Sequence, residues 1–259
     1  MSRASGCEQE QRSYEIDRGA GGFQRFRQAL RFTDLVDRTG LPKATLHRIL
    51  STLLEERLLH FDGTSKSYRL GIRLITWAHN TWHGLDIRHI AAEELKHLGE
   101  LTNETIHLAI LDGERTVYVD KHESSQQVRM YSAVGKTGPV HCTGVGKVIA
   151  AFLEPTEREA LVGQLSFDRY TASTITDPRL FMTELDSIRE SGYGRDEREH
   201  EDEIRCIAAP VLDHQGRSVA SISISAPAYR ISDDKIEQWL PQLLESVRKV
   251  SENYARILR

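Results

Sequence analysis

The chain has little cysteine and no long apolar run. Its 259 residues include three cysteines, Cys7, Cys142 and Cys206, which are too widely spaced for a disulfide framework or a zinc knuckle. No apolar run approaches the roughly 18 residues that a membrane span needs. Residues 1–22 lack the apolar centre of a signal peptide. We therefore expect no disulfide scaffold, no membrane partner and a reducing, cytoplasmic location.

A net positive charge is lacking over most of the chain and is found only in its first part. Residues 1–72 hold 12 Lys/Arg against 9 Asp/Glu, whereas the remainder holds 22 against 29. A basic head on an acidic body predicts that only the head meets a polyanion such as DNA. The content of 39% hydrophobic residues is sufficient for a real core and argues against wholesale disorder.

Two short helical patterns separated by a glycine follow residue 31. "TDLVDRTG" predicts a helix capped by Thr33 and closed by Gly40, and "LPKATLHRILSTLLEERLL" predicts a second helix with Pro42 at its first position. The apolar residues of the second helix recur at the spacing of one buried face. Such a pair is typical of a helix-turn-helix, whose second helix enters the major groove of DNA.

A hairpin pattern around Asp62-Gly63 comes next and predicts a wing. Thr45 and Arg48 are the expected base readers, since Arg suits a guanine edge. Lys43, Lys66 and Arg69 are the expected phosphate contacts. The complete set of predicted DNA-binding residues is Pro42, Lys43, Ala44, Thr45, His47, Arg48, Lys66 and Arg69.

Residues 73–100 form a long, mostly helical stretch with a break expected at Gly84. Its apolar stripe indicates packing on a partner chain or on the next domain. His79 and His83 have a spacing that metal sites use, but no third ligand is evident nearby, and we favour a solvated or dimer-facing pair. From Glu104 onward strand and helix patterns mix, which predicts an α+β domain. Pro241 is expected to kink the last helix or to mark its start.

Two motifs in this second part leave alternatives open. "GVGKV" is not a phosphate loop, because Lys147 is followed by Val148 and position 141 is not glycine. Its glycines predict either the floor of an anion pocket or a plain tight turn. "SISIS" places Ser221, Ser223 and Ser225 on one strand face. That face is either the wall of a polar pocket or a small-residue surface that admits a helix.

The stretch "EHEDEIRCIAAPV" could hold a metal or a reactive thiol. It contains no HExxH motif, and we interpret its acidic residues, 199–203, as mostly solvated surface. Cys206 adjoins Arg205, but strand alternation sends the two side chains to opposite faces. A buried, inert Cys206 is the favoured interpretation.

Five segments in this order resemble the IclR family of bacterial transcription regulators: "LPKATLHRILSTLLEERLL", "YRLG", "HCTGVGKVIAA", "GYGRDEREHEDEIRCIAAPV" and "ASISISAP". "ETIHLAILD" and "VRMYS" resemble the branch that contains the 2-keto-3-deoxygluconate repressor. The resemblance implies a winged helix-turn-helix, a linker helix and a GAF-like α/β effector-binding domain. It also implies a homodimer or homotetramer that binds double-stranded operator DNA and a small organic acid such as a keto or sugar acid.

The same resemblance implies which residues line an effector pocket and where the domains begin. The pocket residues are Gly144, Val145, Asp196, Cys206, Ser223 and Ser225. We expect a flexible arm over 1–22, the DNA-binding domain over 23–72, a linker and dimerisation helix over 73–100 and the effector-binding domain over 101–259. The first helix of the family is expected to be short or shifted here, since "RGAGGFQRFRQAL" is rich in glycine.

We expect a repressor of a catabolic operon, with no catalytic residue, cofactor or metal. Two alternatives remain. One is a redox-sensing regulator that uses Cys142 and Cys206, which would change only the nature of the input. The other is a thiol-dependent enzyme built on the GAF-like domain, which would leave the helix-turn-helix unexplained.

Overall fold

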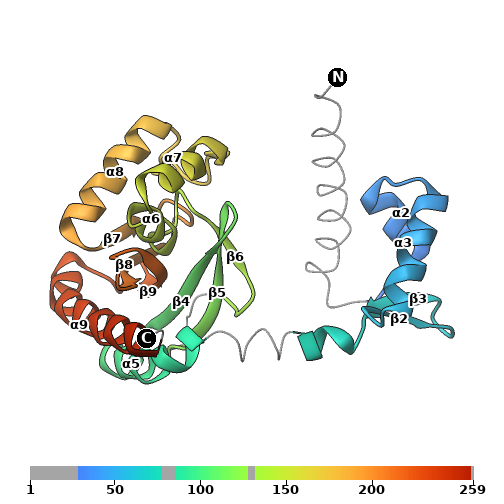
Figure 1. Cartoon of the computed structure of the whole chain (residues 1–259), viewed down its shortest axis with the longest axis horizontal. Helices are drawn as coiled ribbons and strands as arrows, with labels where there is room; N and C mark the ends of the chain where they lie inside the picture. The colour runs from blue at the N-terminus through green and yellow to red at the C-terminus, as the bar shows by residue number, and fades with distance from the viewer. Residues whose placement is uncertain (1–28, 78–85, 128–131, 258–259) are drawn as a thin grey trace. The chain divides into compact units, whose positions relative to one another are not determined.

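The structure, a computed structural model, describes residues 29–77, 86–127 and 132–257. The chain divides into two compact units, residues 1–84 and 85–259, and each is described by itself below (Figure 1). The expected arm at residues 1–22, the histidines His79 and His83 and the expected break at Gly84 all lie outside the described residues. Residues 73–77 and α5 (Asp86–Thr102) are the helical parts of the expected linker.

The first unit is a winged helix-turn-helix, as predicted. Strand β1 (Leu30–Arg31) precedes helices α2 (Phe32–Thr39) and α3 (Lys43–Glu55), and strands β2 (Leu59–Asp62) and β3 (Ser67–Leu70) form the wing. The three strands make an antiparallel sheet in the order β1-β3-β2. Its small core consists of the buried side chains of Leu30, Leu35, Leu46, Leu50 and Leu59.

The ends of these helices differ slightly from the prediction. Gly40 closes α2 in the left-handed conformation, with φ 66°, and donates its N–H to the Val36 carbonyl at 3.0 Å. Arg31, not Thr33, is the N-cap, because the Asp34 carboxylate accepts the Arg31 N–H at 2.9 Å and lies at the positive end of the helix dipole. Pro42 is the N-cap of α3 and not its first residue.

The wing turn is longer than an Asp-Gly hairpin. Four residues, 63–66, connect β2 to β3, and Lys66 adopts the left-handed conformation with φ 51°. The Asp62 carboxylate accepts the Thr64 N–H at 2.9 Å, which holds the turn closed. The predicted hairpin is confirmed, with the turn built around the Asp62 side chain.

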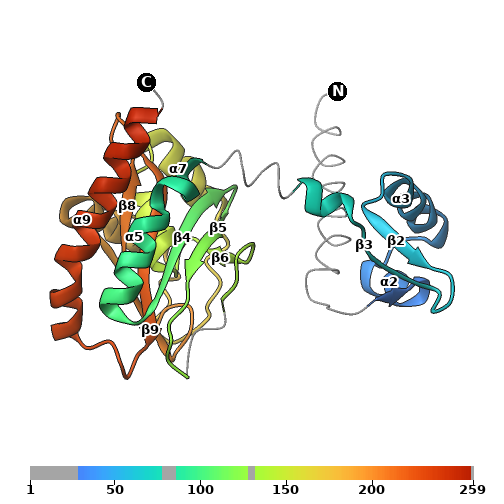
Figure 2. The same ribbon diagram turned by 90° about the horizontal axis from the view of Figure 1, so that it is seen from below.

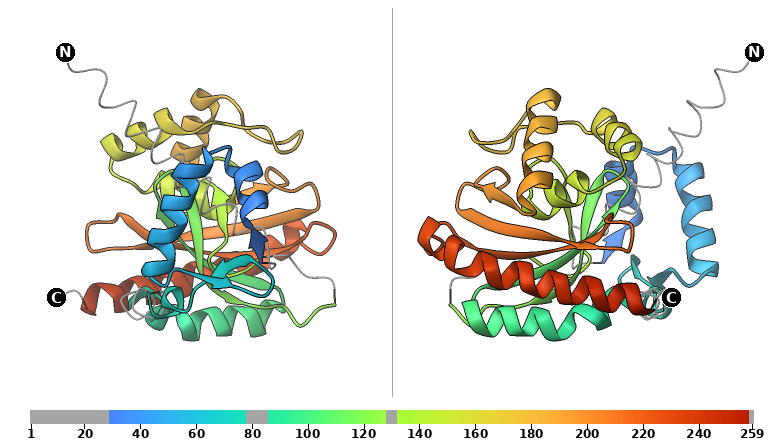
Figure 3. Two further views of the ribbon diagram at one scale, coloured as in Figure 1. Left: turned by 90° about the vertical axis from the view of Figure 1, so that its right-hand side faces the viewer. Right: turned by 60° about the vertical axis from the view of Figure 1, so that its left-hand side comes forward.

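The second unit is an α+β domain built on one antiparallel sheet of six strands in the order β6-β5-β4-β9-β8-β7. These strands are β4 (Thr105–Asp112), β5 (Arg115–His122), β6 (Thr137–Pro139), β7 (Gly194–Glu197), β8 (Ile204–Leu212) and β9 (Ser218–Pro227). Helices α5 and α9 (Asp233–Ile257) lie side by side on one face (Figure 2). Helices α6 (Gly144–Ala151), α7 (Pro155–Gln164) and α8 (Pro178–Ser191) cover the other (Figure 3).

Alternation along β9 sorts its side chains between these two layers. Ile222 and Ile224 are fully buried in the core that α5 and α9 share with the sheet. Ser221, Ser223 and Ser225 therefore point to the α6 side, as the period of two requires. Each sheet face thus has its own core, and the face toward α6 carries the buried serines of β9.

Helix α9 runs unbroken from Asp233 to Ile257 with Pro241 inside it. The alternative in which Pro241 marks the helix start is therefore wrong. The helix starts after Ser232, whose hydroxyl accepts the Lys235 N–H at 3.4 Å. Within the described ranges, none of the helices has the length and apolar character needed to cross a membrane.

Candidate DNA-binding surface and effector cavity

Helix α3 presents a polar face that its own core residues leave free. Leu46 and Leu50 are buried, each about 3% exposed, and fix the orientation of the helix against the first unit's core. Thr45 is half-buried, and the other predicted contacts of this segment are exposed: Pro42, Lys43, Ala44, His47 and Arg48. The structure thus brings the predicted base readers and their neighbours to one end of an accessible helix.

The wing carries the remaining predicted contacts on its exposed side. Lys66 stands in the turn and Arg69 on the return strand β3, and both side chains are exposed. Ser67, between them in sequence, is buried. Within this first unit, the predicted phosphate contacts are therefore accessible, as contacts to a nucleic-acid backbone require.

In the second unit, a polar cavity of about 160 Å³ lies on the α6 side of the sheet. All six residues predicted for the effector pocket line it, although they come from α6, β7, β8 and β9. The sequence did not reveal the other lining residues, which are Tyr118, Ser132, Lys136, Thr137, Gly138, Thr143, His200, Glu201 and Ile204. Most of these lie on β5, β6 or loops that only the tertiary fold brings to the cavity.

Strand register explains how the distant polar residues meet. Asp196 on β7 stands opposite Cys206 on β8, and Cys206 stands opposite Ser225 on β9. Because opposite residues in antiparallel strands point to the same face, the three side chains form one row across the sheet. Ser223 follows two residues from Ser225 on that face. The cavity wall is therefore a direct product of pairing between β7, β8 and β9.

The start of α6 closes the cavity against this wall. Thr143 is the N-cap: its hydroxyl accepts the Gly146 N–H at 3.3 Å and donates to the Pro139 carbonyl at 2.7 Å. Gly144 lies so close to β8 that a Cβ there would be 2.5 Å from Cys206 Sγ. Only glycine allows this approach. Of the two alternatives for "GVGKV", the glycine-rich helix start lines the cavity and is more than a plain turn.

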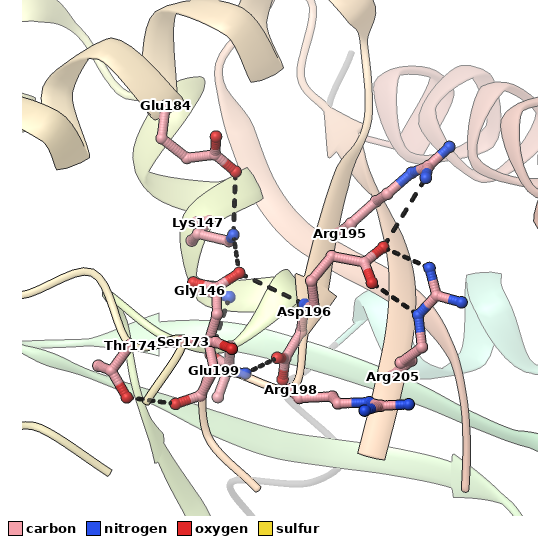
Figure 4. Close-up of polar contacts among 12 residues, drawn as sticks. Gly146, Lys147, Ser173, Thr174, Glu184, Arg195, Asp196, Arg198, Glu199 and Arg205 are labelled. Carbon is pink, nitrogen blue, oxygen red and sulfur yellow. Dashed lines mark hydrogen bonds and ion pairs between the residues drawn. The ribbon is translucent and has the colours of Figure 1, made fainter. Parts of the chain in front are cut away.

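Behind the cavity, Lys147 is a buried cation held by two carboxylates. Its Nζ lies 2.5 Å from Glu199 Oε1 and 2.9 Å from Glu184 Oε1, as Figure 4 shows. Burial disfavours the ammonium, but the Glu199 and Glu184 carboxylates outweigh that cost and raise the pKa of Lys147. The interpretation of residues 199–203 as solvated surface is therefore wrong for Glu199, which is 5% exposed. The sequence contained one signal for this ion pair: Lys147 lies within an apolar helix, and a buried lysine needs a buried acidic partner.

Asp196 is the one acidic side chain in the buried part of the cavity wall. Its Oδ1 accepts the Glu199 N–H at 2.7 Å, and the nearby Lys147 is already engaged with Glu199 and Glu184 (Figure 4). Burial, with the nearby Glu199 charge, raises the pKa of Asp196 to about 7. Near neutral pH the carboxyl is therefore divided between a form that donates a hydrogen bond and a form that only accepts.

The two described cysteines are buried thiols without the environment of a nucleophile. Burial and the Asp196 charge raise the pKa of Cys206 to about 12, and the same two causes raise the pKa of Cys142. Reactive cysteines have the opposite shift, because the thiolate is the nucleophile. Arg205 points away from Cys206, as predicted, and pairs with Glu197 and Asp233. Cys206 therefore acts as cavity wall.

The described part of the chain contains no group of three or more His, Cys, Asp or Glu side chains placed to hold a metal ion. The acidic stretch 199–203 instead divides between the Lys147 ion pair, the cavity rim and solvent.

An exposed recognition helix in one unit and a buried polar cavity in the other define a ligand-responsive, DNA-binding transcriptional regulator. The chain matches the IclR helix-turn-helix domain over residues 23–63 and the C-terminal domain of the bacterial transcriptional regulator IclR over residues 79–252. The chain therefore belongs to the IclR family.

Individual relatives agree with this membership. The chain is 34% identical over 219 residues to the HTH-type transcriptional regulator KdgR of Escherichia coli, covering 85% of this chain and 83% of that one. This agrees with the predicted branch. The crystal structure of the Thermotoga maritima IclR is 28% identical, with a TM-score of 0.72 over 95% of this chain and 99% of that one.

A third similarity extends the fold to a structure with a ligand. An IclR homolog from Microbacterium hydrocarbonoxydans, complexed with 4-hydroxybenzoate, has a TM-score of 0.77 at 23% identity, over 94% of this chain and 98% of that one. That likeness shows the shared fold. The relatives are regulators, so the enzyme alternative is set aside, and nothing supports the redox alternative.

Gly144→Ala tests the close approach of α6 to β8. The new Cβ would lie 2.5 Å from Cys206 Sγ, and we expect a loss of roughly 1–3 kcal/mol in the free energy of unfolding, as for other overpacked cores. Adding Cys206→Ala should recover most of the loss. Urea unfolding of the full chain measures both effects, with Gly163→Ala as control, since a Cβ at Gly163 on α7 meets nothing within 4 Å. Failure of Cys206→Ala to restore stability would contradict the account.

Asp196→Asn tests the buried carboxyl through pH. The folded pKa is raised from 3.8 to about 7, so the folded protein binds more protons than the unfolded chain between these values, and stability falls as pH rises through that window. The variant lacks this dependence. We expect it to melt above the wild type at pH 8 and close to it at pH 5, and the exposed Asp202→Asn is the control for loss of one acidic charge. An equal difference at both pH values would rule out a raised pKa.

Proposed function

We propose that this regulator binds operator DNA through α3 and the wing and represses a catabolic operon until a small organic acid enters the cavity. The effector-binding part of the proposal rests on one observation: all six predicted residues line one buried polar cavity. The DNA-binding part of the proposal rests on the exposed helix face with Lys43 and Arg48 and on the exposed wing cations Lys66 and Arg69.

An acid is the ligand class that the cavity chemistry favours. The start of α6 directs the positive end of a helix dipole toward the cavity, and the hydroxyls of Ser223 and Ser225 can donate to carboxylate oxygens. Asp196 in its protonated form adds a further donor. The 4-hydroxybenzoate bound by the Microbacterium homolog is also a carboxylic acid. Keto acids, sugar acids and aromatic acids are therefore the candidates.

We further propose that two or four copies assemble and that the segment after the wing takes part. Ile75 and Trp77, with Ile72 just before them, are exposed apolar residues at the beginning of the stretch 73–100, which we assign to linking and dimerisation. The DNA-binding domain would span 23–72 and the effector-binding domain 101–259. A dimer would bind two operator half-sites, and the effector would change how the two heads fit them.

Arg48→Ala tests the assigned base reader. Operator sequences are selected from random DNA with the wild-type chain, and affinities are measured by fluorescence anisotropy on the selected site and on random DNA. We expect a loss of about 1–3 kcal/mol on the selected site and relaxed sequence preference. The control Lys43→Ala, a phosphate contact, should weaken both DNAs alike and reduce the salt slope by about one. An equal loss on both DNAs for Arg48→Ala would contradict base reading.

The effector class is tested by thermal shift of the full chain against keto acids, sugar acids and aromatic acids. Ligands that bind the native state raise the melting temperature in proportion to the logarithm of concentration. We expect at least one acid to stabilise the wild type and to lose this effect in Ser223→Ala/Ser225→Ala. The matched neutral alcohols should stabilise the wild type less at the same concentration. Stabilisation of the double variant to the same extent would place the ligand elsewhere.

A further inference from the structure

His107 is a buried imidazole that connects three cavity hydroxyls. It lies on β4 directly opposite Ser223 on β9, and only about 1% of the residue is exposed. Its Nδ1 is 3.4 Å from the Oγ of Ser223 and also 3.4 Å from the Oγ of Ser225. Its Nε2 is 2.7 Å from Ser132 Oγ. All three serines line the cavity, so one ring links two of its walls.

The ring is neutral at physiological pH. Burial, with the nearby Lys121 charge, lowers the pKa of His107 to about 3. The ring of Tyr118 covers one of its faces, with the two centroids 4.7 Å apart. A neutral imidazole has one N–H donor and one bare nitrogen acceptor, so the tautomer decides which serine receives a proton and which gives one.

The distances favour the tautomer with the proton on Nδ1. A single N–H shared between two oxygens gives two long hydrogen bonds, and the equal separations to Ser223 and Ser225 fit this arrangement. A bare nitrogen would instead draw one hydroxyl to an ordinary length of about 2.8 Å. In this tautomer Nε2 is bare, so the short contact is one in which Ser132 donates its hydroxyl proton to Nε2.

This assignment fixes the direction of each cavity hydroxyl. Ser223 and Ser225 both accept from Nδ1–H, and one hydroxyl hydrogen suffices for the 3.2 Å contact between them. The other hydrogen is left to donate into the cavity. Ser132 has committed its only hydrogen to Nε2 and offers the cavity an oxygen lone pair alone. One wall therefore donates and the other accepts.

We propose that His107 is a positioning residue that makes the Ser223–Ser225 pair a donor and Ser132 an acceptor, so that the cavity selects acids that also carry a hydroxyl group. The carboxylate would face the serine pair and the ligand hydroxyl would face Ser132. This inference rests on the proposed function, because it assumes that an acid occupies the cavity. It adds which acids are preferred and in which orientation they bind.

The tautomer is tested first, on the wild-type full chain without ligand. Long-range proton–nitrogen NMR of the ¹⁵N-histidine-labelled protein distinguishes a protonated from a bare ring nitrogen, and the spectrum of His107→Asn identifies the His107 resonances. We expect a neutral ring with the proton on Nδ1. A proton on Nε2, or a charged ring at pH 7, would overturn the proposal whether or not any ligand binds.

Selectivity is tested with glycerate, propanoate and glycerol, which carry a carboxylate and hydroxyls, a carboxylate alone and hydroxyls alone. Dissociation constants for the full chain come from NMR titration. We expect the wild type to bind glycerate about tenfold more tightly than either of the others, as one directed hydrogen bond provides. Equal binding of glycerate and propanoate would overturn the assigned role of Ser132. Binding of none of the three would contradict the proposed acid effector, while the tautomer measurement still decides the state of His107.

Two substitutions separate the halves of the network. The amide of His107→Asn replaces Nδ1–H and cannot reach Ser132, so the preference for glycerate over glycerol should survive and the preference over propanoate should fall. His107→Gln places its amide near the position that Nε2 occupies in the wild type and should have the reverse effect.

His141→Asn is the matched control, because this buried imidazole binds the Asp168 carbonyl and lies outside the cavity lining. Circular dichroism confirms folding. If the preferences for glycerate over glycerol and over propanoate change together in both variants, the proposal is overturned. If either variant does not fold, the tautomer and the ligand preferences of the wild type decide the proposal.

Discussion

The buried ammonium of Lys147 is the constraint on which the effector cavity depends. Its two carboxylate partners come from α8 and from the loop after β7, so one ion pair network ties three segments that are far apart in the sequence. Removing one partner of such a network leaves a buried charge uncompensated, which is why these segments are held together. The backbone of Glu199 in turn holds Asp196 at the cavity wall. Strand register places Asp196 in the cavity wall, and the segment that satisfies this one lysine also hydrogen-bonds its carboxylate there.

The two units divide the chemistry of the regulator between them. The first unit has a core of five buried leucines and exposes its cations, as a surface that meets phosphates must. The second unit buries lysine, aspartate, histidine and serines around a small cavity and satisfies them with one another. A ligand that replaces some of these internal contacts alters the energy of the second unit. Family membership connects that change to DNA binding.

Local patterns were sufficient to predict the helix-turn-helix, the wing and the alternation of β9, because each depends on neighbours within a few residues. The family resemblance predicted six cavity residues. Register between β7, β8 and β9 brings four of them together, and the start of α6 adds Gly144 and Val145. His107, Tyr118 and Lys147 were missed as functional residues, since their partners lie on other strands and helices. The prediction of Thr33 as N-cap was wrong. The Asp34 side chain accepts the backbone N–H of Arg31, and the helix therefore begins two residues earlier than that prediction implies. Periodicity contains no information on such long-range pairs.

We propose that an acid in this cavity controls operator affinity. The most direct test is fluorescence anisotropy of the full chain on its selected operator, with increasing concentrations of an acid that stabilises the protein. The account predicts that operator affinity of the wild type changes by about fivefold or more, a typical coupling between two sites. It also predicts that Ser223→Ala/Ser225→Ala binds the operator normally and ignores the acid. An operator affinity that stays constant while the acid binds the wild type, or a double variant that responds as the wild type does, would contradict it.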